Sequence, residues 1–243
     1  MRSDAVERGV IEGANGLLAE LAVHERNAIQ RASQLQFCAA GDVLLQANAR
    51  SRCVFFPVNA VVAVVRRLRD DRAVGVGLFG SDGMAGIDVA LETKIQIDEV
   101  VVQSAGFVYC MAADDLLHQF QGTGRLQKSI LRFSHTFLAQ VGQNAVCNRY
   151  HSLGQRLAKW LLMIDDRAGS MEGPQSRRLL AIALGANERE IGEALAALTS
   201  ASGIHDRRNT IVIQRDALEF NACECYDVIG TPAIRQEREA RSA

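Results

Sequence analysis

The sequence predicts an α+β fold with an antiparallel β domain first, a long helix next and a small helical domain last. Three patterns predict this order. Short β-branched runs fill residues 37–113, an apolar stripe at helical spacing follows Gly124, and two short helical patterns precede a β-rich segment near residue 210. With 243 residues, of which 48% are hydrophobic, the chain is long enough for one large domain or for two modest domains with cores of their own.

The amino-acid composition and charge exclude several classes of protein. Charged residues make up 23% of the chain, which is typical of globular proteins and excludes disordered and collagen-like classes. The formal net charge of −1 provides no overall attraction to nucleic acid, so DNA binding would need a local basic face. The apolar stretch Val58–Val65 is far shorter than the roughly 20 residues of a membrane-spanning helix, and the charged N-terminus does not resemble a signal peptide. We therefore expect a cytoplasmic protein.

The first part of the chain is predicted to be helical and then rich in strands. Leucine and isoleucine residues near helical spacing predict a helix over residues 14–36. Short runs separated by turn residues then predict an antiparallel sandwich or roll. These runs are Val43–Leu45, Cys53–Phe56, Ala60–Leu68, Ala73–Phe79, Ile87–Leu91, Glu99–Ser104 and Phe107–Met111.

A hairpin is predicted inside this region, because two β-rich arms flank the acidic turn Asp70-Asp71. Gly75 and Gly77 lie on one face of the second arm. Glycine inside a strand marks a bend or a close approach of another part of the chain. We therefore expect one of these two features along the second arm.

The long helix is predicted from an a/d-like apolar stripe. Its members are Leu126, Ile130, Phe133, Phe137 and Val141. Such a stripe can pack against its own domain or against the same helix of a second copy. We expect a homodimer through the helix at residues 124–147, with these five residues in the interface.

The last third of the chain predicts a helix-turn-helix. Helical patterns at Arg177–Leu184 and Glu188–Leu198 are separated only by Gly185-Ala186-Asn187. A polar break at His205–Asn209 and the β-rich run Thr210–Ile213 then predict a wing.

Several segments, taken in order, resemble the Crp/Fnr family of transcription regulators over residues 14–230. They include Val54-Phe-Phe-Pro57, Gly80-Ser-Asp-Gly-Met84, Val101-Val-Gln-Ser-Ala-Gly106, Gln143-Asn-Ala-Val-Cys-Asn-Arg149 and Cys223-Glu-Cys-Tyr226. The resemblance implies a cyclic-nucleotide-binding-like β-roll (a double-stranded β-helix) over 14–123, a dimerisation helix over 124–147 and a winged helix-turn-helix over 148–230. It also implies three partners, namely a palindromic promoter site in DNA, a second copy of the chain and RNA polymerase.

The resemblance also locates a candidate effector pocket. In relatives that bind cyclic nucleotides, a Gly-Glu pair after the hairpin holds the ribose and a nearby Arg holds the phosphate. Here the turn runs from Gly80 to Met84, and Asp98 and Glu99 occupy the stretch where the Arg would fall. At 4 Å an acidic group repels a phosphate by on the order of 1–4 kcal/mol. We therefore expect an effector pocket at Gly80, Met84, Asp98 and Glu99 that does not bind cyclic nucleotides, and the effector is left unidentified.

The six cysteines fit reduced thiols better than a disulfide framework. Iron–sulfur members of the Fnr branch carry several closely spaced N-terminal cysteines, whereas this chain has only Cys38 and Cys53 there. Cys223 and Cys225 form a C-x-C motif that fits a redox pair, a metal site or plain packing. Two ligands are too few for a structural zinc site, so we expect no metal and no cofactor.

Cys147 and His151 lie four residues apart, on one face of a helix. They have the residue types of a nucleophile and a base. The sequence shows no orienting acid beside them, which favours a hinge contact. We therefore expect no enzymatic activity.

The DNA contacts are expected on the second helix of the motif and in the wing. Asn187 and Glu190 have the spacing of a capping box. Relatives commonly place Arg, which reads guanine edges, where this chain has Asn187 and Glu188, whereas here the arginine is Arg189. Wing side chains usually meet phosphates. The expected DNA-binding residues are therefore Asn187, Glu188, Arg189, Arg207 and Arg208.

The predicted DNA face is only modestly basic. Residues 176–215 contain six arginines and four acidic residues, so the net charge of this segment is six minus four, or +2. The arginines are Arg177, Arg178, Arg189, Arg207, Arg208 and Arg215. We expect a DNA-binding regulator whose β-roll senses a signal. The alternative is a degenerate relative that dimerises, has lost specific DNA recognition and acts through protein contacts.

Overall fold

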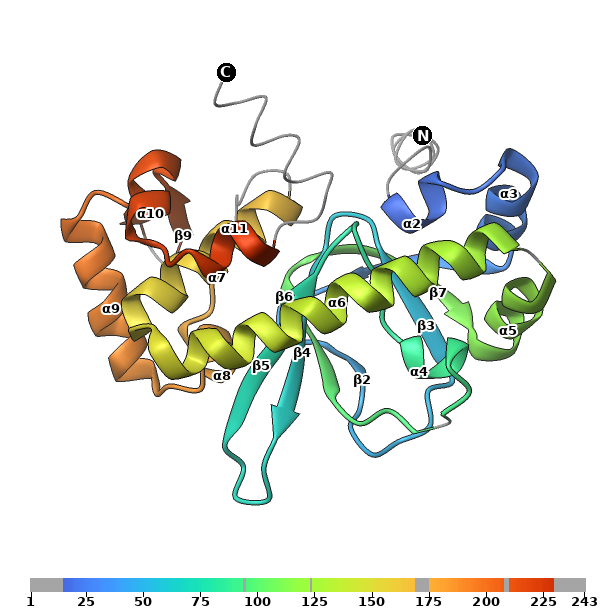
Figure 1. The fold of residues 1–243 in the computed structure, drawn as a ribbon, viewed down its shortest axis with the longest axis horizontal. Coiled ribbons are helices and arrows are strands. Elements are labelled where there is room, and N and C mark those ends of the chain that lie inside the picture. Colours follow the sequence, from blue (N-terminus) through green and yellow to red (C-terminus); the bar gives the residue numbers. More distant parts are fainter. Residues whose placement is uncertain (1–14, 94, 123, 169–174, 208–209, 230–243) are drawn as a thin grey trace. The chain divides into compact units, whose positions relative to one another are not determined.

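The computed structural model describes residues 15–93, 95–122, 124–168, 175–207 and 210–229 (Figure 1). The β-rich part confirms the predicted antiparallel sheets. One sheet has the strand order β1-β7-β3 and the other has the order β2-β6-β4-β5. The strands are β1 (Ser33–Cys38), β2 (Val43–Leu45), β3 (Cys53–Pro57), β4 (Val61–Arg67), β5 (Ala73–Phe79), β6 (Glu99–Ser104) and β7 (Gly106–Ala112). Both sheets contribute fully buried residues to the core, such as Phe56, Val102 and Met111.

The predicted N-terminal helix is wrong as a single element. Residues 14–36 contain two short helices, α2 (Gly16–Ala19) and α3 (Val23–Arg31), and then enter β1. The side chain of Asn15 begins α2 by accepting hydrogen bonds from backbone N–H groups. All six residues of β1 pair antiparallel with β7, and this ladder outweighs the weak local preference for helix.

The predicted strand Ile87–Leu91 is also wrong, because these residues form the short helix α4 (Ile87–Ala90). Gly86 has a φ of 90°, in the left-handed region that breaks an extended chain. A Cβ there would lie 2.8 Å from the side chain of Val54, so glycine is required on both counts. Short apolar runs do not by themselves distinguish a strand from a buried helical turn.

The chain forms two compact units. One comprises Met1–Val62 and Phe79–His135, and the other comprises Ala63–Leu78 and Thr136–Ala243. The division between them therefore falls within the long helix α6 (Gly124–Tyr150), whereas the sequence placed a boundary before it. The three-part division at 14–123, 124–147 and 148–230 stays a prediction.

Within the second unit the β4–β5 hairpin packs closely against helices, as its glycines predicted. A Cβ on Gly75 would lie 2.8 Å from the carbonyl oxygen of Ala183, and one on Gly77 would lie 2.5 Å from the ring of Phe137. β5 is an edge strand, and side-chain amides of α6 satisfy part of its backbone. Gln140 accepts from the N–H of Leu78 at 2.6 Å.

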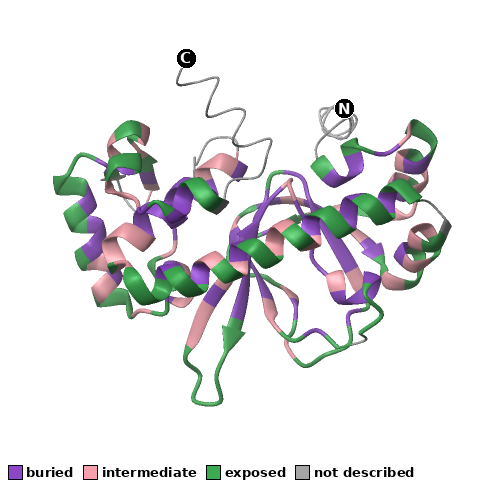
Figure 2. Ribbon diagram, in the orientation of Figure 1, coloured by how far each residue is buried: buried purple, intermediate pink, exposed green. Residues whose placement is uncertain are grey.

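The second unit ends in helices around a two-stranded sheet. The elements are α7 (Leu153–Ala168), α8 (Arg177–Leu184), α9 (Glu188–Ser200), β8 (Ile204–Arg207), β9 (Thr210–Ile213), α10 (Arg215–Asn221) and α11 (Cys225–Ile229). Residues 157–164 of α7, which include Trp160 and Leu161, are all buried (Figure 2). In the part of the chain that the structure describes, no helix is long and apolar enough to cross a membrane.

Candidate nucleic-acid interface

The helix-turn-helix consists of α8 and α9. Ser176 begins α8 by accepting from the N–H of Leu179 at 3.3 Å. Gly185 ends it with a φ of 61°, a left-handed conformation that favours glycine at a helix C-terminus. The buried face of α9, including Ile191 and Leu195, packs into the unit, so the opposite face and the first turn are left for a ligand.

The first turn of α9 carries the predicted capping box. Asn187 Oδ1 accepts from the N–H of Glu190 at 2.9 Å, and Glu190 Oε2 accepts from the N–H of Asn187 at 2.9 Å. The cap holds both side chains at the helix start. Glu188 is exposed beside them.

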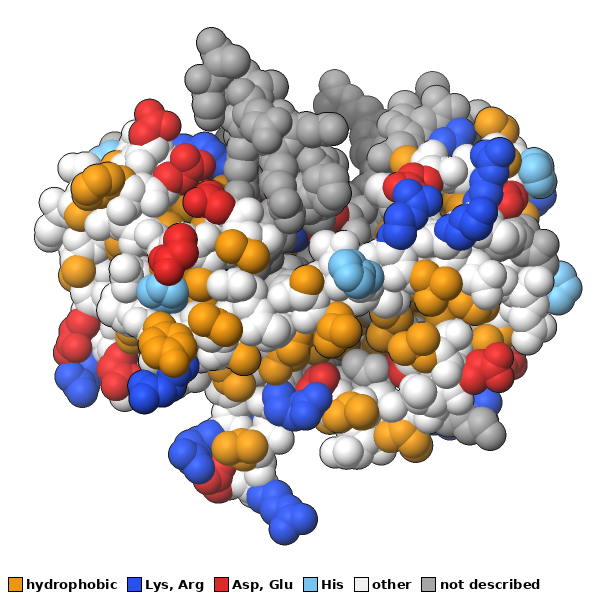
Figure 3. All heavy atoms as spheres, in the orientation of Figure 1, with side chains coloured by type: hydrophobic (Ala, Val, Ile, Leu, Met, Phe, Trp, Pro, Cys, Tyr) orange, Lys and Arg blue, Asp and Glu red, His pale blue; other side chains and the backbone are white. Residues whose placement is uncertain are grey.

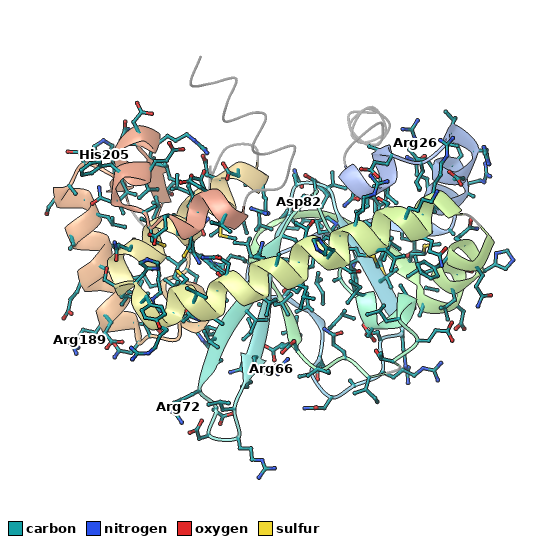
Figure 4. All side chains as sticks on the ribbon, viewed as in Figure 1. Arg26, Arg66, Arg72, Asp82, Arg189 and His205 are labelled. Atoms are coloured by element: carbon teal, nitrogen blue, oxygen red, sulfur yellow. The ribbon has the colours of Figure 1, made fainter. Side chains whose placement is uncertain are left out.

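Arg189 points outward from the same turn (Figure 4). Its guanidinium pairs with Glu193 one turn along the helix at 2.6 Å. The two side chains are 74% and 64% exposed, and such a surface pair contributes at most about 1 kcal/mol. An external anion can therefore replace Glu193 at little cost.

Arg215 does not belong to the basic face on which the sequence analysis counted it. Its guanidinium binds Asp165 at 2.9 Å and also Asp166, Glu219 and the hydroxyl oxygen of Tyr226. Burial lowers the pKa of Arg215, but the hydrogen bond and charge of Asp166 outweigh this and the pKa is raised. The guanidinium of Arg215 thus belongs to an ion-pair cluster that joins α7 to α10.

The wing is the β8–β9 hairpin, in which His205 faces Val212 and Arg207 faces Thr210. β8 occupies part of the segment predicted as a polar break. Arg208 lies outside the described residues, and so does the side chain of Arg207. The role expected of these two arginines stays a prediction.

The predicted dimer stripe faces inward instead. Leu126, Ile130 and Phe133 are buried in the single chain, and Phe133 packs edge-on against Phe79 with ring centroids 5.5 Å apart. These three side chains are therefore already covered in the single chain and need no second copy to bury them. Phe137 and Val141 are half-buried.

Large apolar side chains on another face of α6 are exposed instead, namely Leu131, Leu138 and Val146 at 49%, 70% and 47%. Figure 3 shows hydrophobic side chains along α6 on the face of the molecule in view.

The predicted effector residues do not line either of two cavities that the β-rich unit contains. The side chain of Met84 is buried in the core, and the N–H of Gly80 donates to Asp82 at 2.8 Å within its turn. Asp98 and Glu99 are half-buried. One of the cavities is lined by Arg50, Ser51 and Asp88, among others, and sequence reasoning did not identify it.

The two cysteine motifs of the sequence come together in the second unit. Cys147, His151, Cys223 and Cys225 offer one ligand atom each, and these four atoms lie within 4.8 Å of one another. The premise that Cys223 and Cys225 provide only two ligands is therefore wrong. Folding places residues 76 positions apart in contact, which no local spacing could reveal.

Comparison with known proteins identifies the class of this fold. No protein-family model and no curated protein matches this chain. Solved structures match over most of its length, and many of them are Crp/Fnr-family transcription regulators. The chain thus has the Crp/Fnr fold, which confirms the predicted fold class.

Three of these structures illustrate the likeness. The c-di-GMP-responsive global regulator CLP of Xanthomonas campestris is 17% identical, with a TM-score of 0.63 over 79% of this chain and 99% of its own. FixK2 from Bradyrhizobium japonicum is 16% identical, with a TM-score of 0.64 over 79% and 98%. A Crp/Fnr-family transcriptional regulator from Thermus thermophilus is 16% identical, with a TM-score of 0.60 over 78% and 98%. At these identities the likeness establishes the fold.

Proposed function

We propose that this chain is a homodimeric, cytoplasmic DNA-binding transcription regulator without enzymatic activity. The observation that carries the proposal is the α8–Gly185–α9 motif with a capped, exposed first turn, followed at once by the β8–β9 wing. In a winged helix-turn-helix the second helix enters the major groove and the wing lies along the backbone. The fold shared with Crp/Fnr regulators supports the same assignment.

The dimer is proposed to form through the exposed face of α6. Leu131 and Leu138 are seven residues apart, which places them on one side of the helix as in a coiled-coil seam. A two-fold arrangement would present two α9 helices to the two halves of a palindrome. The β-rich unit would then sense a signal whose chemistry is left open, and RNA polymerase would be the further partner of the bound dimer.

A second candidate function is a dimeric module that acts through protein contacts. The observation that favours it is the charge of the α9 first turn, where Glu188 is exposed and Arg189 is paired with Glu193. An acidic turn is repelled by the phosphates on both sides of the groove.

Selection of bound duplexes from a random DNA library distinguishes the two functions. A DNA-binding regulator enriches a palindrome whose half-sites are one helical turn, about 10–10.5 base pairs, apart. Arg189→Ala should weaken binding to the enriched duplex, whereas Arg72→Ala in the β4–β5 hairpin serves as a control of equal charge change. Enrichment of no sequence by the full-length chain would favour the protein-contact module.

A further inference from the structure

We propose that Cys147, His151, Cys223 and Cys225 form a tetrahedral zinc site. Three of the four residues are buried and His151 is half-buried. Three thiolates and one imidazole are a ligand set that structural zinc sites use, with no position left for water. The proposal is independent of the DNA-binding function.

The distances fit a single ion. Zinc bonds of about 2.3 Å to sulfur and 2.0–2.1 Å to nitrogen place tetrahedral ligands about 3.8 Å apart for two sulfurs and about 3.6 Å apart for sulfur and nitrogen. Cys147 Sγ and Cys223 Sγ lie 3.5 Å apart, and Cys225 Sγ lies 3.5 Å from His151 Nδ1. The sulfurs of a disulfide would be only about 2.0 Å apart, and all these cysteines are free.

The surrounding polar groups orient the ligands as they do in zinc proteins. His151 Nε2 lies 3.1 Å from a carboxylate oxygen of Glu224, which leaves Nδ1 facing the sulfurs. A carboxylate on the outer nitrogen of a ligating histidine fixes the tautomer and the ring. Gln143 Nε2 donates to Cys225 Sγ at 3.0 Å and would stabilise a thiolate there.

The charge of the site complements a buried cation. Three thiolates and Zn²⁺ sum to −1, and the ammonium of Lys159, which is 3% exposed, interacts with Cys147. The ammonium of Lys159 itself hydrogen-bonds a neutral amide, that of Asn144, at 2.7 Å. A buried cation is costly unless a negative charge lies near it, and the loaded site provides one.

The zinc would join three segments of the second unit. Cys147 is near the end of α6, and His151 is at the junction of α6 and α7. Cys225 begins α11, and Cys223 lies two residues before it. One ion would hold the C-terminal segment against these two helices. Removal of the ion should therefore loosen the unit that carries α8 and α9, and not the β-rich unit.

The test measures zinc in the full-length chain purified without a metal-affinity tag. Inductively coupled plasma mass spectrometry should find about one zinc per chain. Cys225→Ser and His151→Gln should each lose most of it, and Glu224→Gln should weaken zinc affinity by about 10- to 100-fold. The matched control is Cys110→Ser, because Cys110 lies in β7 outside the cluster and should leave the zinc content unchanged.

A second readout needs no variant. With zinc bound, the thiols of Cys147, Cys223 and Cys225 should resist alkylation in the native protein, and a chelator should expose them while Cys53 reacts equally in both states. Cobalt(II) in place of zinc should give the visible absorption of a tetrahedral, thiolate-bound ion. Three outcomes overturn the proposal: no metal after anaerobic addition of zinc, a Cys147–Cys223 disulfide in the purified chain, or an iron–sulfur chromophore.

Discussion

The buried ammonium of Lys159 donates to Asn144 Oδ1 at 2.7 Å, and the amide nitrogen of Asn144 donates to the carbonyl oxygen of Val76 at 2.9 Å. One side chain of α6 thus connects a cation on α7 to the edge strand of the β4–β5 hairpin. A hydrogen bond to a charged group contributes more than a neutral one, and leaving the charge without its acceptor costs more still.

Replacement of Asn144 should therefore destabilise the second unit. Asn144→Ala removes the acceptor of a buried cation and the donor to a strand carbonyl, and should lower the free energy of unfolding by about 2–4 kcal/mol. Urea denaturation followed by far-UV circular dichroism measures this loss. The control Gln127→Ala changes an exposed residue of the same helix and should stay within about 0.5 kcal/mol. Equal effects of the two changes would contradict the role given to Asn144.

Gly75 tests the close packing of the hairpin. Gly75→Ala places a Cβ 2.8 Å from the backbone oxygen of Ala183 and 2.9 Å from the side chain of Trp160. A backbone atom cannot shift without moving its helix, so the variant should be destabilised by about 1–3 kcal/mol. Gly154→Ala meets nothing within 4 Å in α7 and should be neutral or stabilising by up to about 1 kcal/mol. Thermal melting compares the two, and a higher Tm for Gly75→Ala than for Gly154→Ala would refute the contact.

Arg215 should matter for stability and not for DNA affinity. Arg215→Met removes the guanidinium that pairs with the carboxylate of Asp166, a side chain that is only 4% exposed. The free energy of unfolding should fall by about 3 kcal/mol. This is the lower end of the range for a broken buried pair, because Arg215 is itself 21% exposed. Arg189→Ala breaks an exposed pair and should cost less than about 1 kcal/mol. Chemical denaturation of both variants gives the comparison, and the reverse order of costs would disprove the assignment.

The dimer face is tested by charge placed on α6. Leu138→Glu puts a carboxylate on a side chain that is 70% exposed in the single chain, so it should leave the fold intact and shift a dimer to monomer in sedimentation velocity. Phe133→Glu instead buries a carboxylate in the core and should destabilise the chain. A Leu138→Glu variant that stays dimeric at low micromolar concentration would rule out this face.

Much of the fold could be predicted from the sequence because its signals are local. The runs at Ala73–Phe79 and Glu99–Ser104 and the two helices around Gly185 are found with the predicted bounds or close to them. Residues 33–36 and 87–90 were misassigned because a distant strand or a tight core packing decides their conformation.

The candidate sites were harder to predict because they depend on which distant groups meet. α6 has two apolar faces, and periodicity does not tell which of them its own domain covers. Cys147 and Cys223 belong to motifs that are incomplete by themselves and meet only in the folded chain. Arg215 counts as a surface cation until its partners Asp165 and Asp166 are known.

DNA affinity as a function of salt tests the central claim most directly. On a duplex obtained by selection, fluorescence anisotropy should give a log–log salt slope set by several phosphate contacts, about −0.9 for each. Replacing both Arg207 and Arg208 by Ala should flatten that slope by up to about two contacts per half-site.

Glu188→Arg should raise affinity and add about 1–3 kcal/mol of discrimination at one base pair. Binding by neither the wild type nor Glu188→Arg would contradict the account, and loss of tight binding in Glu188→Arg would make Glu188 itself the base reader.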